Sequence, residues 1–261
     1  MGLRVEEGTS APPAAGVVWH DLECGGYAAD LELWRALADA ECGPGEPLLD
    51  VGAGSGRVTL DLARRGHRVD ALDRDGDLLD ALAERAAAEG LAVETICADA
   101  RSFGLERRDY PLCIVPMQTV QLLAGSRERS ELLSQARAHL RPGGLLACAI
   151  VTDVEPFDRT GGDRSPRAEI ARFGPRTYAS RPVRVAREAD AIVIERERTV
   201  LCAGAGGSRE TATEIDVVRL ARVSAARLAD EGRQAGFRPE RSRLVGETSE
   251  HVGSEVVMLR A

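Results

Sequence analysis

Short apolar runs alternate with longer amphipathic segments through the middle of the chain. The run 48–51 (LLDV) ends in the glycine-rich stretch 52–56, after which apolar residues recur at helical spacing. Further apolar runs follow at 69–72, 92–100, 110–116 and 145–151. This alternation predicts an α/β domain with a parallel sheet.

The glycine-rich stretch and Asp73, at the end of the second run, predict a nucleoside site. Glycine lets the backbone turn sharply and approach a ligand closely, and an acidic residue about 20 positions later can accept both ribose hydroxyls. The motif is GxGxG, with Arg57 where a dinucleotide fingerprint has its third glycine, so binding of a pyrophosphate is not favoured. Asp50, just before the turn, suits a cationic amino-acid group better than a phosphate. A turn that binds no ligand is the alternative for the glycines taken alone.

Several motifs in order resemble the class I S-adenosylmethionine (SAM)-dependent methyltransferases that act on small molecules. They are DVGAGSG, the acidic Asp73, the Asp99-Ala100 pair and the LRPGG turn, and the resemblance is firm over residues 45 to 152. It implies a doubly wound α/β fold with a seven-stranded sheet of order 3-2-1-4-5-7-6, in which strand 7 is antiparallel. An inserted antiparallel β meander is expected after strand 5.

The resemblance also implies S-adenosyl-L-methionine as cofactor and S-adenosyl-L-homocysteine as product. Asp73 would hold the ribose, Asp99 and Ala100 the adenine edge, and the glycine turn with Tyr27 the amino-acid portion. The expected cofactor contacts are Tyr27, Asp50, Gly52, Ala53, Gly54, Asp73, Arg74, Asp99, Ala100, Pro116, Gln118 and Gln121. Tyr27 has an alternative role in packing the helix that follows it.

Changes in pattern divide the chain into four segments. Residues 1–17 are rich in Ala, Pro and Gly and are expected to be disordered or loosely attached. Residues 18–151 would form a leading helix and the SAM-binding core. Residues 152–223 contain three β-type runs, expected to cap the acceptor site or to form a dimer surface. Residues 224–261 would supply the last helix and strands 6 and 7.

Composition narrows the classes of partner. The chain of 261 residues carries a formal net charge of -8, and 3% of its residues are aromatic, which disfavours nucleic acid. Six cysteines without a CxxC pair predict a reducing, cytoplasmic location and no metal site. No apolar run is long enough for a membrane span, so no membrane association is expected. A small-molecule acceptor is the expected partner, and a homodimer is possible.

No catalytic dyad is evident, and methyl transfer from a sulfonium depends mainly on orientation. An amine acceptor, which can attack once neutral, is therefore slightly favoured over a hydroxyl or carbon acceptor. The candidates for catalysis are His20, Tyr27, Gln118 and His251, with Gln118 and Gln121 also expected to position the acceptor. The site is expected at the edge of the sheet where the carboxyl ends of the parallel strands meet. Other residues in segments that could reach this edge are Glu23, Asp153, Glu155 and Tyr178.

Other charged and titratable groups are expected to be structural or solvated. His67 and His139 are interpreted as structural, and the clusters 127–129 and 195–198 as solvated surface. Two other functions remain open. One is a SAM-binding protein that transfers no methyl group, either a cyclase or lyase or a non-enzymatic partner protein. The other is a NAD-dependent oxidoreductase, which the GxGxG spelling disfavours.

Overall fold

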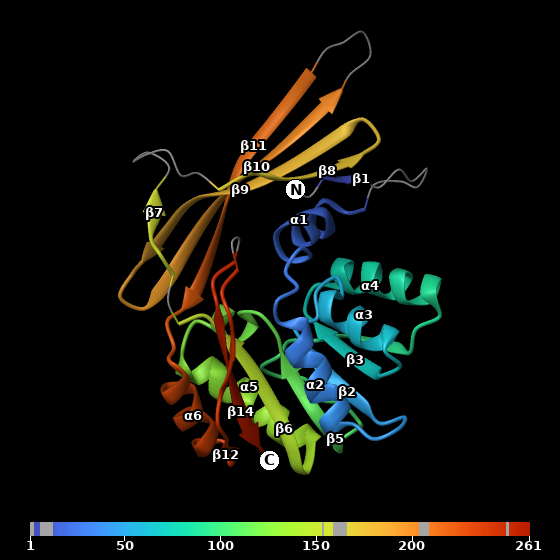
Figure 1. Cartoon of the computed structure of the whole chain (residues 1–261), viewed down its shortest axis with the longest axis vertical. Helices are drawn as coiled ribbons and strands as arrows, with labels where there is room; N and C mark the ends of the chain where they lie inside the picture. Colours follow the sequence, from blue (N-terminus) through green and yellow to red (C-terminus); the bar gives the residue numbers. More distant parts are fainter. Residues whose placement is uncertain (1–2, 6–12, 153, 159–165, 204–208, 249–250) are drawn as a thin grey trace. The chain divides into compact units, whose positions relative to one another are not determined.

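The computed structural model describes residues 3–5, 13–152, 154–158, 166–203, 209–248 and 251–261. The chain divides into two compact units, and Figure 1 follows the path through both. The core unit comprises Tyr27–Asp153 and Ala221–Ala261, and the meander unit comprises Met1–Gly26 and Val154–Leu220.

The core unit contains a twisted mixed sheet. Its strands are β2 (Pro47–Val51), β3 (Arg68–Asp73), β4 (Val93–Cys97), β5 (Tyr110–Val115), β6 (Leu140–Ile150), β12 (Arg238–Pro239), β13 (Arg243–Val245) and β14 (Ser254–Arg260). They are ordered β12-β14-β6-β5-β2-β3-β4, with β13 also paired to β14. β14 runs antiparallel to β6. The expected order 3-2-1-4-5-7-6 is confirmed, with expected strand 6 present as two short pieces, β12 and β13.

Helices cover both faces of this sheet. They are α2 (Leu31–Glu41), α3 (Arg57–Arg64), α4 (Gly76–Glu89), α5 (Ser126–His139) and α6 (Ala225–Gln234), with the 3-10 helix η1 (Thr119–Leu122) after β5. Leu48 of β2 packs with apolar residues of α2 and α3, whereas its neighbour Leu49 packs with those of α5 and α6. Because successive strand residues point to opposite faces, both faces of β2 are buried. Among the described residues, no helix combines the length and apolarity that crossing a bilayer requires.

The meander unit has a separate sheet and one helix. Its elements are β1 (Leu3–Val5), α1 (Ala15–Cys24), β7 (Phe157–Asp158), β8 (Glu169–Phe173), β9 (Arg176–Arg187), β10 (Ala191–Ala203) and β11 (Arg209–Ala221). The order is β1-β8-β9-β10-β11, with β7 paired to β9. β9 pairs antiparallel with both β8 and β10. The three runs expected to form the meander correspond to β9, β10 and β11, which are neighbours in this order.

The N-terminal segment contributes a strand and a helix to the meander unit. Leu3–Val5 pairs in parallel with β8, and α1 begins at Ala15, while residues 1–2 and 6–12 of the segment 1–17 lie outside the described residues. Val18 and Trp19 of α1, which follow that segment, form a small apolar cluster with Ala171 and Tyr178. The segment up to Gly26 therefore groups with the meander unit. Two helices, α1 and α2, stand where one leading helix was expected.

The expectation of solvated charge is wrong for parts of both clusters. Arg129 on α5 makes two hydrogen bonds of 2.8 Å to Glu231 on α6, and the two side chains are only 7% and 4% exposed. In the meander unit, the Arg198 side chain is 17% exposed and bonds both oxygens of Glu23. These arginines join elements that are far apart in sequence.

Candidate active site

The turn between β2 and α3 depends on glycine at three positions. Gly52, Gly54 and Gly56 have φ values of 78°, 56° and 98°, which other L-residues rarely adopt. A Cβ on Gly52 would lie 2.3 Å from Cγ2 of Thr119 in η1. The glycine therefore permits both the turn and the close packing of the segment that follows β5.

The amides of this turn are largely used inside the protein. Gly52 and Ala53 donate to the carbonyl oxygen of Leu72, at 2.8 and 3.1 Å, and Gly54 donates to Oδ2 of Asp73 at 2.8 Å. A pyrophosphate would need free N–H groups at such a turn. The geometry thus agrees with the sequence argument against a dinucleotide.

Asp73 is fixed between the turn and the next helix. Its Oδ1 accepts the amide of Asp75 at 3.0 Å, and its carbonyl oxygen accepts the amide of Ala98 at 2.9 Å. A carboxylate has about four acceptor positions, so Asp73 can still accept two hydroxyl groups. Arg74, beside it, is exposed. The contact with Ala98 brings the turn at Asp99 to the same edge of the sheet.

Asp99 is held by Arg101. The guanidinium bonds both carboxylate oxygens, with a shortest distance of 2.6 Å, and the Arg101 amide donates to Oδ1 at 2.8 Å. These bonds lower the pKa of Asp99 to about 2. Arg101 also bonds Glu128 at 3.1 Å, which ties this turn, including the half-buried Ala100, to the start of α5.

Two buried oxygen atoms of the core unit have no hydrogen-bond partner among the described residues. They are Oδ1 of Asp50 and the hydroxyl of Tyr27. The other oxygen of Asp50 accepts a 2.7 Å bond from Thr59, but burial dominates and raises the pKa of Asp50 to about 7. Because buried polar atoms in native proteins are nearly always paired, both atoms point to a missing ligand or water.

Two candidate residues, Tyr27 and His251, lie together. Their ring centroids are 5.0 Å apart, and Thr248 accepts a 2.9 Å bond from the His251 amide. Burial and the charge of Asp30 raise the pKa of Tyr27. Ser254 is near enough to oppose that rise, but no described residue makes a hydrogen bond of normal geometry to the hydroxyl.

The segment after β5 contains a strained residue that the sequence did not reveal. Met117 has φ 52°, the one positive value among the described non-glycine residues, and such strain is commonly found at functional sites. Before it, the carbonyl oxygen of Pro116 accepts the Thr119 hydroxyl at 3.1 Å. After it, the half-buried Gln118 has a side-chain amide with no partner in the described part of the chain. Gln118 is therefore free to meet a ligand.

Gln121 has a different role from the expected one. It is fully buried, and its amide nitrogen donates to the carbonyl oxygens of Val151 and Ala221, both at 3.0 Å. Its amide oxygen accepts the Val151 N–H at 2.7 Å. These three bonds occupy the side chain, so Gln121 is a structural residue rather than a cofactor or acceptor contact.

The remaining described candidates belong to the meander unit. His20 and Glu23 lie on α1 of the meander unit, where Glu23 pairs with Arg198 and Ser180. Tyr178, also in that unit, packs its ring against Trp19 at 5.2 Å. Glu155 is exposed in the same unit. Asp153 lies outside the described residues.

His139 is structural, as expected. It is 1% exposed; Nε2 accepts the Leu105 amide at 3.0 Å, and Nδ1 is 2.7 Å from the Gln135 carbonyl oxygen. These partners require the neutral tautomer with hydrogen on Nδ1. His67 pairs at 2.9 Å with Asp39.

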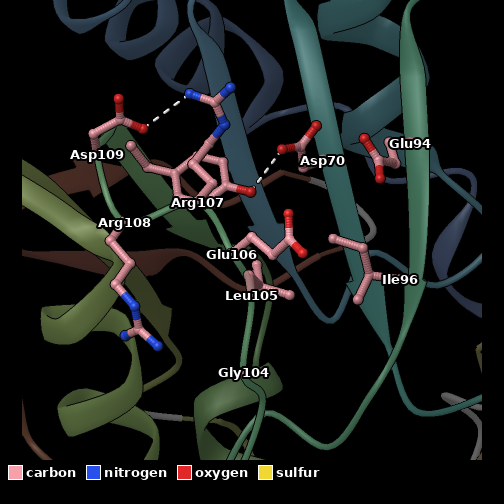
Figure 2. A pocket seen from close by; sticks show the side chains of 10 residues that line it. Asp70, Glu94, Ile96, Gly104, Leu105, Glu106, Arg107, Arg108 and Asp109 are labelled. Atoms are coloured by element: carbon pink, nitrogen blue, oxygen red, sulfur yellow. Dashed lines mark hydrogen bonds and ion pairs between the residues drawn. The ribbon is translucent and has the colours of Figure 1, made fainter.

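A separate cavity, shown in Figure 2, is lined by residues of β3 and β4 and of the loop before β5. Asp70 in its wall accepts a 2.6 Å bond from the Tyr110 hydroxyl, and Arg107 pairs with Asp109. None of the expected site residues lines it. Among the described residues, no three His, Cys, Asp or Glu side chains gather as metal ligands.

Curated proteins match the core region over part of their length. The ribosomal RNA small subunit methyltransferase A of Deinococcus radiodurans is 42% identical over 78 residues, which are 30% of this chain and 26% of that protein. The cypemycin N-terminal methyltransferase of a Streptomyces species is 32% identical over 121 residues, 46% of this chain and 47% of that protein. This chain therefore spans between a quarter and a half of the length of these relatives.

Solved structures resemble most of the chain. The sugar N-methyltransferase KedS8 from Streptoalloteichus has a TM-score of 0.66 and 19% identity, with 100% of both chains covered. The SAM-bound CalS10, an amino pentose methyltransferase from Micromonospora echinaspora, has a TM-score of 0.64 and 20% identity, with 94% of this chain and 97% of that chain covered. At these identities the likeness establishes the fold. Residues 48–144 also match the family model for a methyltransferase domain. This segment is therefore a methyltransferase domain, and the chain has the class I methyltransferase fold.

Proposed function

We propose that this protein transfers the methyl group of S-adenosyl-L-methionine to an amine of a small-molecule acceptor and releases S-adenosyl-L-homocysteine. The observation that carries the proposal is the carboxylate of Asp73, fixed by the amide of Gly54. It stands beside a turn in which the amides of Gly52 and Ala53 already donate to Leu72. Such a site can bind ribose hydroxyls while offering few donors to a pyrophosphate.

The residues at this edge fit the proposed cofactor. Asp73 would accept the ribose hydroxyls, and the turn at Asp99 and Ala100 would meet the adenine edge. The unpaired Oδ1 of Asp50 suits the ammonium of the amino-acid portion, directly or through water, and the unpaired Tyr27 hydroxyl suits its carboxylate. The other contacts that we retain are Gly52, Ala53, Gly54, Arg74, Pro116 and Gln118. When bound, the cofactor supplies a methyl group already activated by its sulfonium.

An amine acceptor is supported by the chemistry of methyl transfer and by the activities of similar proteins. Transfer from a sulfonium to a neutral amine needs mainly orientation and no activated nucleophile of the protein. The amine nitrogen would gain the methyl group and then lose a proton to solvent or to His251. Gln118 is the proposed positioning group. Similar proteins include a sugar N-methyltransferase, an amino pentose methyltransferase and a cypemycin N-terminal methyltransferase.

We further propose that residues 152–223 select the acceptor and do not contribute to cofactor affinity. The basis is that most of this segment builds its own sheet, with its own apolar cluster and ion pairs, separate from the elements that carry Asp73 and Asp99. The net charge of -8 supports a small metabolite over nucleic acid.

The decisive experiment has two arms. Calorimetry with S-adenosyl-L-homocysteine and with NAD tests the cofactor, and we expect binding of the former alone. SAM with a deuterated methyl group is then incubated with matched amino and hydroxy sugars, and mass spectrometry locates the label. Labelled amino sugar is the expected product. Tight binding of S-adenosyl-L-homocysteine, without transfer of the label to any of the sugars, would favour a SAM-binding protein that carries out other chemistry.

A further inference from the structure

A buried ion pair joins the start of α3 to the start of α2. Arg57, the first residue of α3, bonds both oxygens of Asp30, with Nη1–Oδ1 and Nη2–Oδ2 distances of 2.6 and 2.8 Å. The two side chains are 9% and 2% exposed. Oδ2 of Asp30 also accepts the indole N–H of Trp34 at 2.8 Å. The guanidinium is thus held in one orientation directly after the glycine turn.

The same guanidinium holds Tyr27 at two points. Nη1 of Arg57 donates to the carbonyl oxygen of Tyr27 at 2.8 Å, and its Cζ lies 5.1 Å from the centre of the tyrosine ring. His251 also contacts that ring. Backbone and ring are therefore fixed, while the hydroxyl has no partner among the described residues.

This arrangement is not the most stabilising use of these residues. Asp30 is the N-cap of α2 but makes no capping bond, because its carboxylate is used by Arg57 and Trp34. A buried ion pair contributes little net stability compared with apolar packing of the same volume. Arg57 and Asp30 also lie close enough to Asp50 to act on its charge, so the pair belongs to the region of both unpaired oxygen atoms.

We infer that Arg57 and Asp30 are positioning residues that fix the Tyr27 hydroxyl toward the amino-acid portion of the cofactor. The inference rests on the proposed function. It assigns them to this portion rather than to the adenosine, because Arg57 follows the glycine turn and contacts Tyr27, whereas Asp73 ends β3 and Asp99 follows β4. Arg57, which stands where a dinucleotide fingerprint has its third glycine, thus has the role of positioning Tyr27.

The test compares two ligands by calorimetry. S-adenosyl-L-homocysteine contains the amino-acid portion, whereas 5′-methylthioadenosine keeps the adenosine and thioether and lacks that portion. For Arg57→Lys, which cannot bond Asp30 and Tyr27 in the same fork geometry, we expect affinity for the first ligand to fall about 5- to 150-fold. Affinity for the second should change less than about twofold. Arg64→Lys, which alters an exposed pair with Glu89 on the same helix, is the matched control.

Tyr27→Phe completes the design. It should show the same selective loss, and adding Arg57→Lys to it should weaken binding little further, because both changes remove one interaction. Equal losses for both ligands, or no loss, in folded Arg57→Lys would overturn the inference. If Arg57→Lys does not fold, Tyr27→Phe and Asp30→Asn carry the same comparison, and an unselective effect in both overturns it. Failure of the wild type to bind either ligand would instead reject the proposed function.

Discussion

Oδ2 of Asp73 accepts a 2.8 Å hydrogen bond from the amide of Gly54, which lies 19 positions earlier in the chain. One contact therefore holds the glycine turn to the carboxylate that we propose as the ribose acceptor. Since Oδ1 is fixed by Asp75, the carboxylate cannot rotate without losing a bond. A carboxylate that is oriented before a ligand arrives reduces the entropy lost on binding.

Removing the Asp73 carboxylate should weaken cofactor binding. In Asp73→Ala the ribose hydroxyls would lose their acceptor, at a cost of about 1 to 3 kcal/mol, or roughly 5- to 150-fold in affinity for S-adenosyl-L-homocysteine. Calorimetry measures the change, with Asp80→Ala on the exposed face of α4 as control. Equal affinities in the wild type and Asp73→Ala would remove Asp73 from the site.

The buried Asp50 should make stability fall as the pH rises. Its pKa of about 7 lies above that of an exposed aspartate, so its contribution is full below about pH 4 and is lost as the pH rises through 7. Relative to Asp50→Asn, the free energy of unfolding of the wild type should drop between pH 5 and 8, by up to about 1.4 kcal/mol per pH unit. Urea denaturation across this range tests it. Parallel curves for the two proteins would show that Asp50 is ionised throughout.

The pair of Arg129 and Glu231 should matter far more than a surface pair on the same helix. Arg129→Met leaves a buried carboxylate with only the bond from Arg227, and should lower the free energy of unfolding by about 3 to 5 kcal/mol. Arg127→Met, which breaks an exposed pair with Glu131, should cost less than about 1 kcal/mol. Adding Glu231→Leu to Arg129→Met should recover part of the loss. Similar costs for Arg127 and Arg129 would contradict the buried pairing.

Substitution of Gln121 should lower stability, whereas substitution of Gln118 should lower turnover. Gln121→Ala leaves backbone groups of Val151 and Ala221 unpaired, so unfolding should become easier by about 1 to 3 kcal/mol per unpaired group. Gln118→Ala should leave stability unchanged and lower kcat with the native acceptor. Denaturation curves and steady-state kinetics on both variants test the assignment, and the reverse pattern would refute it.

His251 should assist the reaction only modestly. If orientation supplies most of the rate, His251→Ala should reduce kcat less than about tenfold across pH 6 to 9, with affinity for S-adenosyl-L-homocysteine intact. His67→Ala, which removes a 2.9 Å hydrogen bond to Asp39, is the control. A hundredfold loss specific to His251 would indicate base catalysis and favour a hydroxyl or carbon acceptor.

The sequence predicted the core well because its motifs have strict local geometry. The sharp turn at the glycines and the acidic end of β3 each follow from a few neighbouring residues. The sheet order followed from the family resemblance. Local pattern is enough where the structure is locally determined.

The sequence did not predict contacts between distant segments, because its motifs report only on neighbouring residues. Arg129 and Glu231 are 102 positions apart, and nothing local pairs them. One signal was present, because Arg129 shares a helix face with Leu132, Leu133 and Ala136, all buried. An arginine on an apolar stripe indicates a buried partner. No comparable signal marks Gln121 or the strain at Met117.

The three hydrogen bonds of Gln121 affect how freely the segment between Val151 and Ala221 can change in length. Val151 is where the chain leaves the core sheet after β6, and Ala221 is where it returns, so a single side chain ties the exit to the re-entry. An excursion whose ends are already neighbours adds little closure entropy as it lengthens. The intervening 152–220 can therefore change in length with little cost to the core unit, which carries Asp73 and Asp99.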